Sequence, residues 1–183
     1  MERTFSIDGI YAGWIVGNIS DSNDSYYFHA GYLTDFPNDL MLALLTALGD
    51  WDPDERKDRF KVEMEPAVSK WQISLEGKDL VFDIATFEFE HAEREKRHDI
   101  VRVDKDRFLD DFLSTMSDVL HKFGLLGYRK EWSYEFPLSL YLKLYDLHNG
   151  NRIKTEQGSA KDNIGQEYVR TDLDAEKGLI GEI

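Results

Sequence analysis

The chain has 183 residues and carries 36 Asp and Glu against 22 Lys and Arg, which gives a formal net charge of −14. Such a charge disfavours nucleic acid and anionic membranes as partners, because surfaces that bind phosphate need clustered Lys and Arg. Basic proteins, cations and neutral ligands remain as partners. The absence of cysteine excludes disulfides, thiolate metal sites and a cysteine nucleophile.

The first part of the chain has the alternating pattern of β-strands. Residues 4–19 predict a strand with a break near Gly9, and the polar run 20–25 predicts a turn. Residues 26–33 predict the returning strand, so we expect a β-hairpin at this end of the chain.

An apolar stripe at three- and four-residue spacing then predicts a core helix over residues 37–48. After the acidic, turn-forming segment 50–55, apolar residues again alternate with polar ones, as in β-strands. Four further strands are predicted there, over residues 60–65, 70–75, 80–89 and 100–103, with a hairpin turn between the second and the third.

Helical spacing recurs strongly over residues 105–123, and a third helix is predicted over residues 137–147. We therefore predict the α+β class, with an antiparallel sheet of about five to seven strands and two or three helices packed mainly on one face. Residues 1–150 form one globular domain in this prediction. The apolar density falls afterwards, so residues 151–183 are expected to be a polar tail whose order depends on docking to the domain or to a partner.

The sequence holds none of the common phosphate-binding, nucleophile-elbow or helical zinc motifs. His91 and His98 flank a charged run and could ligate a divalent metal with nearby carboxylates, although a solvated charged loop is the favoured interpretation. Glu63, Glu65 and Asp83 could form a catalytic cluster, but alternation with apolar residues is more typical of an outward sheet face. We predict no catalytic residue, no metal and no cofactor.

The acidic segment 50–55 and the outward glutamates are instead candidates for a protein-binding surface. A tryptophan among carboxylates combines an apolar anchor with a charged rim, as binding hot spots do. The aromatic residues Tyr128, Trp132 and Tyr134 are the second candidate. The predicted partner-binding residues are Asp50, Trp51, Asp52, Asp54, Glu55, Glu63 and Glu65.

A series of segments also supports a resemblance to a known family. These segments are Phe28–Asp35, the leucine-rich helix ending at Gly49, Val62–Pro66, Trp71–Ile73 and Leu80–Ile84. In this order they resemble the small acidic immunity proteins encoded beside bacterial polymorphic or contact-delivered toxins. The resemblance covers roughly residues 25–90, and the polar tail is not part of the pattern.

The resemblance implies a cytoplasmic protein that binds one cognate toxin domain and blocks its active site or its docking surface. A nuclease is one candidate for this toxin, because an acidic surface can fill a cationic substrate groove. A metal- or carboxylate-dependent hydrolase and a dimeric adaptor that pairs through its tail remain as alternatives. No signal-peptide pattern and no apolar run of roughly 20 residues is present, so we expect a soluble, cytoplasmic protein.

Overall fold

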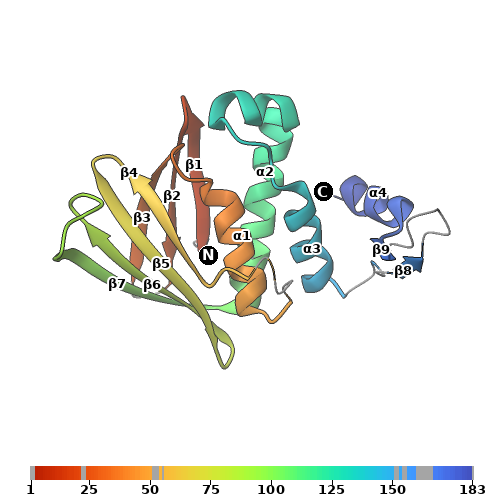
Figure 1. Cartoon of the computed structure of the whole chain (residues 1–183), viewed down its shortest axis with the longest axis horizontal. Coiled ribbons are helices and arrows are strands. Elements are labelled where there is room, and N and C mark those ends of the chain that lie inside the picture. The colour runs from red at the N-terminus through yellow and green to blue at the C-terminus, as the bar shows by residue number, and fades with distance from the viewer. Residues whose placement is uncertain are drawn as a thin grey trace. The chain divides into compact units, whose positions relative to one another are not determined.

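The computed structural model describes residues 3–21, 24–50, 54, 56–150, 153, 156–159 and 167–182. The contacts of the chain group into two compact units, Met1–Leu140 and Tyr141–Ile183, and each unit is described by itself. The first unit holds the two larger sheets and the helices that pack against them (Figure 1).

The first sheet is an antiparallel meander of three strands, which are β1 (Phe5–Tyr11), β2 (Trp14–Ser20) and β3 (Ser25–Gly31). The sequence predicted one strand over residues 4–19, whereas the chain reverses at Ala12 and Gly13, whose φ angles are 49° and 80°. Two residues with positive φ make the tight turn that fits the twist of a hairpin. Alanine is an unusual residue at a position with positive φ, so the residue types hardly indicate this turn. The predicted break is a register shift between Ile7 and Gly9.

Helix α1 (Phe36–Ala47) confirms the predicted core helix and buries Leu40 and Leu44 completely. The second sheet follows it as an antiparallel meander of four strands, which are β4 (Arg59–Met64), β5 (Ala67–Glu76), β6 (Asp79–Phe87) and β7 (Glu95–Asp104). The predicted alternation is present, because Val62 and Trp71 are buried while the neighbouring Lys70 is exposed.

Helix α2 (Lys105–Trp132) begins as predicted and extends further than predicted. The carboxylate of Asp104 caps its first turn by accepting the backbone N–H of Arg107 at 3.1 Å. Gly124 has non-helical dihedral angles (φ 62°, ψ 174°), after which the chain becomes helical again. The predicted helix end is therefore a break between two helical segments. Helix α3 (Leu138–His148) matches the third predicted helix.

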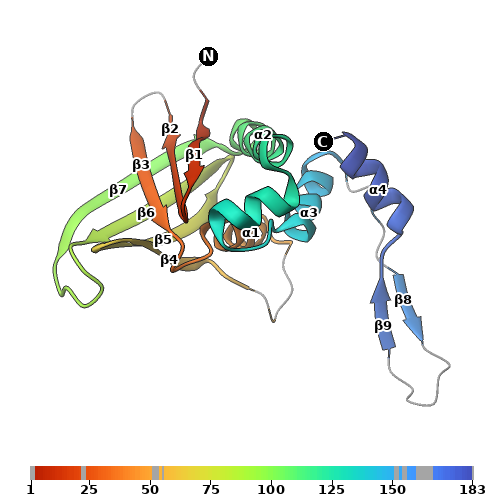
Figure 2. The same cartoon turned by 90° about the horizontal axis from the view of Figure 1, so that it is seen from above.

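The α+β class is confirmed, but the strands form two sheets in the first unit instead of one. Helix α1 packs on β4 and β5, and α2 packs mainly on β1, so both helices lie on the same side of the sheets (Figures 1 and 2). Strand β3 lies next to β4 where the two sheets meet. Aromatic rings from both sheets and both helices form the core between these layers, and they include Phe5, Phe28, Phe36, Phe60, Trp71, Phe82, Phe108 and Phe112.

The second unit contains the remainder of α3 and three short elements, which are β8 (Glu156–Ser159), β9 (Glu167–Arg170) and α4 (Leu173–Glu182). Strands β8 and β9 pair in antiparallel fashion. The buried carboxylate of Asp146 accepts the backbone N–H of Ile153 at 3.1 Å. Sequence analysis assigned no element to residues 151–183. Across the described residues of both units, none of the helices is long and apolar enough to cross a membrane.

A first prediction concerns α2 and the core. The ring of Phe112 is fully buried and lies 5.0 Å from the ring of Phe5 and 5.9 Å from that of Phe108. Replacing Phe112 by Ala should lower the free energy of unfolding by about 3–5 kcal/mol, through lost burial and a new cavity. Urea titration followed by circular dichroism measures this. Leu126→Ala is the control, because Leu126 is 86% exposed and its loss should change stability by less than about 0.5 kcal/mol.

Candidate partner-binding surface

The predicted binding residues that follow α1 are only partly described. The backbone N–H of Asp50 donates to the carbonyl of Leu45 at 3.0 Å, so this residue continues the end of the helix. Asp54 is exposed and lines a hollow of about 570 Å³, together with residues of α1 and the start of α3. Trp51, Asp52 and Glu55 lie outside the described residues.

The two predicted glutamates lie at the other end of α1 and β4 from Asp50 and Asp54. The backbone N–H of Lys57, before β4, donates at 3.0 Å to the hydroxyl of Thr46 near the end of α1. The backbone N–H of Glu63, near the end of β4, donates at 3.2 Å to the hydroxyl of Thr34 before the helix. The helix and strand are therefore antiparallel. A six-residue strand spans about 20 Å, so Glu63 and Glu65 form a group separate from Asp50 and Asp54.

Glu63 and Glu65 also differ in exposure. The side chain of Glu63 is only 13% exposed, and its carboxylate forms an ion pair with Lys61 at 2.7 Å. The ammonium group of Lys61 also reaches Glu90 at 2.6 Å. Hydrogen bonds to Glu63 and then to Glu90 raise the pKa of Lys61, and the bond from Lys61 lowers the pKa of Glu90. Glu65 is exposed in the turn after β4, so it is the more accessible of the two predicted glutamates.

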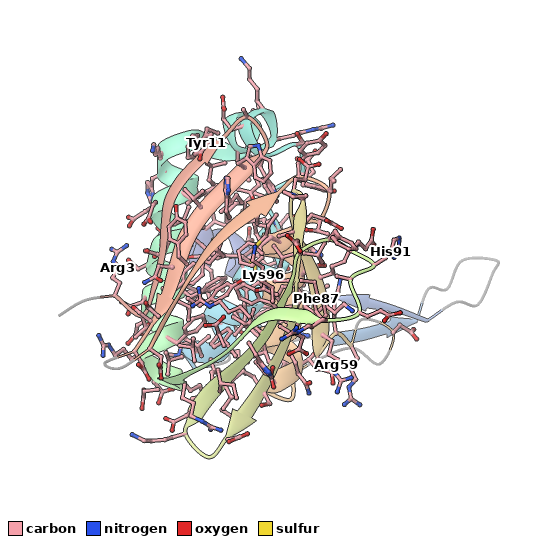
Figure 3. The ribbon with its side chains drawn as sticks, turned by 90° about the vertical axis from the view of Figure 1, so that its left-hand side faces the viewer. Arg3, Tyr11, Arg59, Phe87, His91 and Lys96 are labelled. Carbon is pink, nitrogen blue, oxygen red and sulfur yellow. The ribbon has the colours of Figure 1, made fainter. Side chains whose placement is uncertain are left out.

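Aromatic side chains outside the predicted set lie at the end of the first sheet where Gly31 packs against the backbone of Glu63. Tyr11 and Trp14 are register partners on either side of the β1–β2 turn, and Trp14 is paired with Gly31 on β3. Tyr32 and Leu33 follow Gly31 directly. Figure 3 places Tyr11 at the far end of β1 from Arg3 and from the start of β4 at Arg59.

Hydrogen bonds hold the loop that carries Tyr32 and Leu33. The hydroxyl of Thr34 accepts the backbone N–H of Glu63, and the carboxylate of Asp35 accepts the indole N–H of Trp132 at 3.2 Å. The neighbouring β1–β2 turn is tied to α2, because the N–H of Gly13 donates to the carbonyl of Glu131 at 2.7 Å. These bonds connect the loop to β4 and to α2, so its exposed side chains are presented from a fixed backbone.

We group the residues at this end of the first sheet and at the end of β4 as one candidate surface, which we call the Tyr32 surface. Leu33 is 52% exposed and Tyr32 is 47% exposed, so these neighbouring residues both present apolar area to solvent. Sequence analysis placed both in a strand, where alternation would bury one of them. Their position directly before the helix signal at Asp35 and Pro37 is the feature that could have identified them as loop residues. The Tyr32 surface consists of Tyr11, Trp14, Tyr32, Leu33, Glu63 and Glu65.

The second candidate surface from the sequence, Tyr128, Trp132 and Tyr134, is largely part of the packed interior. Tyr128 and Trp132 are fully buried on the second segment of α2, and the ring of Tyr128 packs edge-on against that of Phe136 at 5.2 Å. Burial raises the pKa of Tyr128 far above its ordinary value, with the charge of Asp35 as a smaller cause. Trp132 contacts the loop of the Tyr32 surface through its hydrogen bond to Asp35.

The residues of the metal and hydrolase alternatives lie on the second sheet. His98 on β7 shares a hydrogen bond of 2.7 Å with Asp83 on β6, which raises the pKa of the histidine, while His91 lies in the loop between these strands (Figure 3). Across the described chain, no group of three or more His, Asp and Glu side chains is placed to hold a metal ion. Pairing through β5 aligns Asp83 with Arg59, four positions from Glu63. The Cα atoms of Asp83 and Glu63 are therefore about 16 Å apart by strand geometry, which does not favour a catalytic pair of their carboxylates.

The fold and the Tyr32 surface together define an acidic α+β protein with exposed aromatic and aliphatic side chains next to carboxylates. Comparisons with protein-family models, with curated proteins and with solved structures found no match. The chemistry of the surface itself is therefore the basis for its proposed function.

A second prediction tests the loop beneath Tyr32. Burial is the main cause that raises the pKa of Asp35, and the hydrogen bond from Trp132 opposes it. The carboxyl group of Asp35 therefore binds its proton more tightly in the folded state than in the unfolded chain. At neutral pH, where Asp35 is ionised, this difference lowers the free energy of unfolding. Asp35→Asn keeps an acceptor for the indole and should be more stable than the parent at pH 7. The difference should vanish as the pH falls through the raised pKa towards about 3.9, the unfolded value.

Urea titrations at pH 7 and pH 3 measure this effect. The exposed Glu65→Gln variant controls for the loss of one negative charge. An Asp35→Asn protein that is less stable than the parent at pH 7 would mean that the charge of Asp35 stabilises the loop.

Proposed function

We propose that this chain is a non-catalytic binding protein, and specifically an immunity protein that neutralises a basic bacterial toxin in the cytoplasm. Three observations support the proposal. The chain is strongly acidic, it resembles small acidic immunity proteins over roughly residues 25–90, and it presents the Tyr32 surface. The exposed apolar side chains of this surface are the observation that carries the proposal.

The charge lies mainly in the first unit. Residues 1–140 carry 28 Asp and Glu against 16 Lys and Arg, a net charge of −12. A field of this sign accelerates the approach of a cationic protein and opposes the approach of acidic ones. Because exposed charges are screened beyond about 8 Å at physiological ionic strength, this acceleration should decline steeply with added salt.

The Tyr32 surface supplies the contact that charge alone cannot supply. Desolvated aromatic and aliphatic side chains contribute most of the binding energy in protein interfaces, and polar rims set orientation and partner choice. Leu33 and Tyr32 form the apolar centre, and the exposed Glu65 lies on the rim. The fixed loop backbone lowers the entropy that ordering the surface would cost on binding.

Binding at this surface would neutralise a toxin by occupying its active site or its docking surface. A toxin that acts on nucleic acid has a cationic groove for phosphates, and an acidic protein is complementary to such a groove. A nuclease is therefore the toxin class that we propose first.

The partner can be identified through the Tyr32 surface itself. A photo-crosslinking amino acid is placed at Leu33 in the full chain, which is then expressed in its native cells. We expect it to capture a basic protein that the same substitution at Leu75 does not capture. Leu75 is also exposed, but it lies near the other end of β5 from the residues that pair with Glu63. The captured protein should arrest growth when produced alone, and the parent chain should restore growth.

A third prediction gives the energetics of this interaction. Leu33→Ala and Tyr32→Ala should each weaken binding of the purified partner by about 2 kcal/mol, because both remove apolar area from the centre of the interface. Glu65→Lys should mainly slow association, and Leu75→Ala should leave affinity unchanged. Surface plasmon resonance measures the rates, with thermal unfolding of each variant measured beside it. Equal affinity of the Leu33→Ala variant and the parent would refute this surface as the binding site.

A further inference from the structure

Three aromatic rings of the Tyr32 surface lie directly on glycine backbone. A Cβ atom added at Gly13 would be 2.9 Å from the ring of Tyr32, and one added at Gly31 would be 3.0 Å from the ring of Trp14. A side chain at either position would push against the ring above it, and the positive φ of Gly13 (80°) also favours glycine there. The ring of Tyr11 lies over Gly9 at a looser distance, 3.4 Å from a Cβ built there.

This arrangement leaves the rings of Tyr11 and Tyr32 about half exposed, whereas Trp14 is partly buried. Tyr11 is 49% exposed, much like Tyr32, as expected for rings with one side covered by backbone and the other side in solvent. The ring of Trp14 is further fixed by packing against the imidazole of His29, with the ring centroids 4.4 Å apart. We call Tyr11, Trp14 and Tyr32 the ring cluster.

The faces of such rings carry negative electrostatic potential and attract cations. Their surroundings add to this attraction, because the backbone carbonyl oxygen of Glu63 lies 3.3 Å from a Cβ built at Gly31, and the exposed Glu65 follows two residues later. The chain already uses this interaction internally, since the Lys70 ammonium lies 4.5 Å from the centroid of the Phe87 ring. A cationic side chain from a partner fits the ring cluster better than an apolar one.

We propose that the ring cluster binds arginine side chains of the basic partner by stacking, an inference that rests on the proposed function for the identity of that partner. Arginine is favoured over lysine because its planar guanidinium stacks on aromatic faces and is more weakly hydrated than an ammonium group. Glu65 can accept hydrogen bonds from the edge of a stacked guanidinium.

Capped tetra-arginine and tetra-lysine peptides test this proposal without the partner. Binding is followed by the NMR signal of the Trp14 indole N–H, which is assigned with a Trp14→Phe variant. We expect tetra-arginine to bind more tightly than tetra-lysine. Tyr32→Leu should weaken the arginine peptide about two- to five-fold, the range that one exposed cation–π contact supplies, and Tyr11→Leu should do the same.

Two control variants separate the effect of the ring face from that of the tyrosine hydroxyl and from that of an exposed tyrosine elsewhere. Tyr32→Phe keeps the face and should bind like the parent. Tyr27→Leu removes an exposed tyrosine five residues before Tyr32 and should also bind like the parent. Thermal unfolding of each variant shows whether a loss of binding reflects a loss of folding.

Several results would overturn the inference. They are equal binding of the two peptides, unchanged binding by Tyr32→Leu and Tyr11→Leu, or a shift of the Trp14 signal with the neutral sugar maltohexaose and none with tetra-arginine. If instead the proposed function is wrong, the crosslinking experiment shows it. In that case the crosslinker at Leu33 captures no basic, growth-arresting protein, whatever the peptides do.

Discussion

The packing around Trp71 holds the first unit together. Its ring is almost completely buried and lies 5.4 Å from the rings of Tyr26 and Phe36 and 5.6 Å from that of Phe60, so it joins β3, α1 and β4. A buried indole N–H needs an acceptor, and the hydroxyl of the buried Ser69 supplies it at 2.8 Å. The position of β3 beside β4, and with it the Tyr32 surface, depends on this cluster of rings.

The Tyr32 surface lies at the point where the chain passes from the first sheet to the first helix. Thr34 and Asp35 anchor this passage to β4 and α2, and the anchoring has a cost, because burial disfavours the ionised form of Asp35. A loop held in this way presents Tyr32 and Leu33 outward in one arrangement. The hydrogen bonds of Thr34 and Asp35 thus fix the loop backbone and also determine which side chains are exposed. A preorganised binding surface requires this combination.

Much of the fold could be predicted because burial is periodic. The alternation of Phe60 and Val62 in β4 and the helical spacing of Phe108 and Phe112 in α2 are local patterns, and both are present in the structure. The division of the strands into two sheets could not be predicted in this way. It is set by contacts between distant residues, such as Tyr26 on β3 with Trp71 on β5.

The candidate site was harder to predict for physical reasons. Ala12 has a positive φ, but alanine does not indicate such a turn. The sequence pattern therefore predicts one strand that contains both Tyr11 and Trp14. Glu63 and Asp54 are close in sequence, but the antiparallel packing of α1 and β4 places them at opposite ends of the strand. Such packing cannot be read from the local sequence. Acidic residues can be identified from the sequence directly. Whether an apolar side chain is exposed depends on the geometry of its loop, which the sequence does not show.

Hydrogen exchange of the chain with and without its purified partner tests most directly which surface binds. Amide exchange followed by mass spectrometry compares residues 11–14, 31–36 and 62–66 with residues 50–58 and 88–98. If the Tyr32 surface is the binding site, exchange should slow in the first three segments and stay unchanged in the other two. Slowed exchange confined to residues 50–58 or 88–98 would contradict this account and place the binding site at the acidic segment after α1 or at the β6–β7 loop.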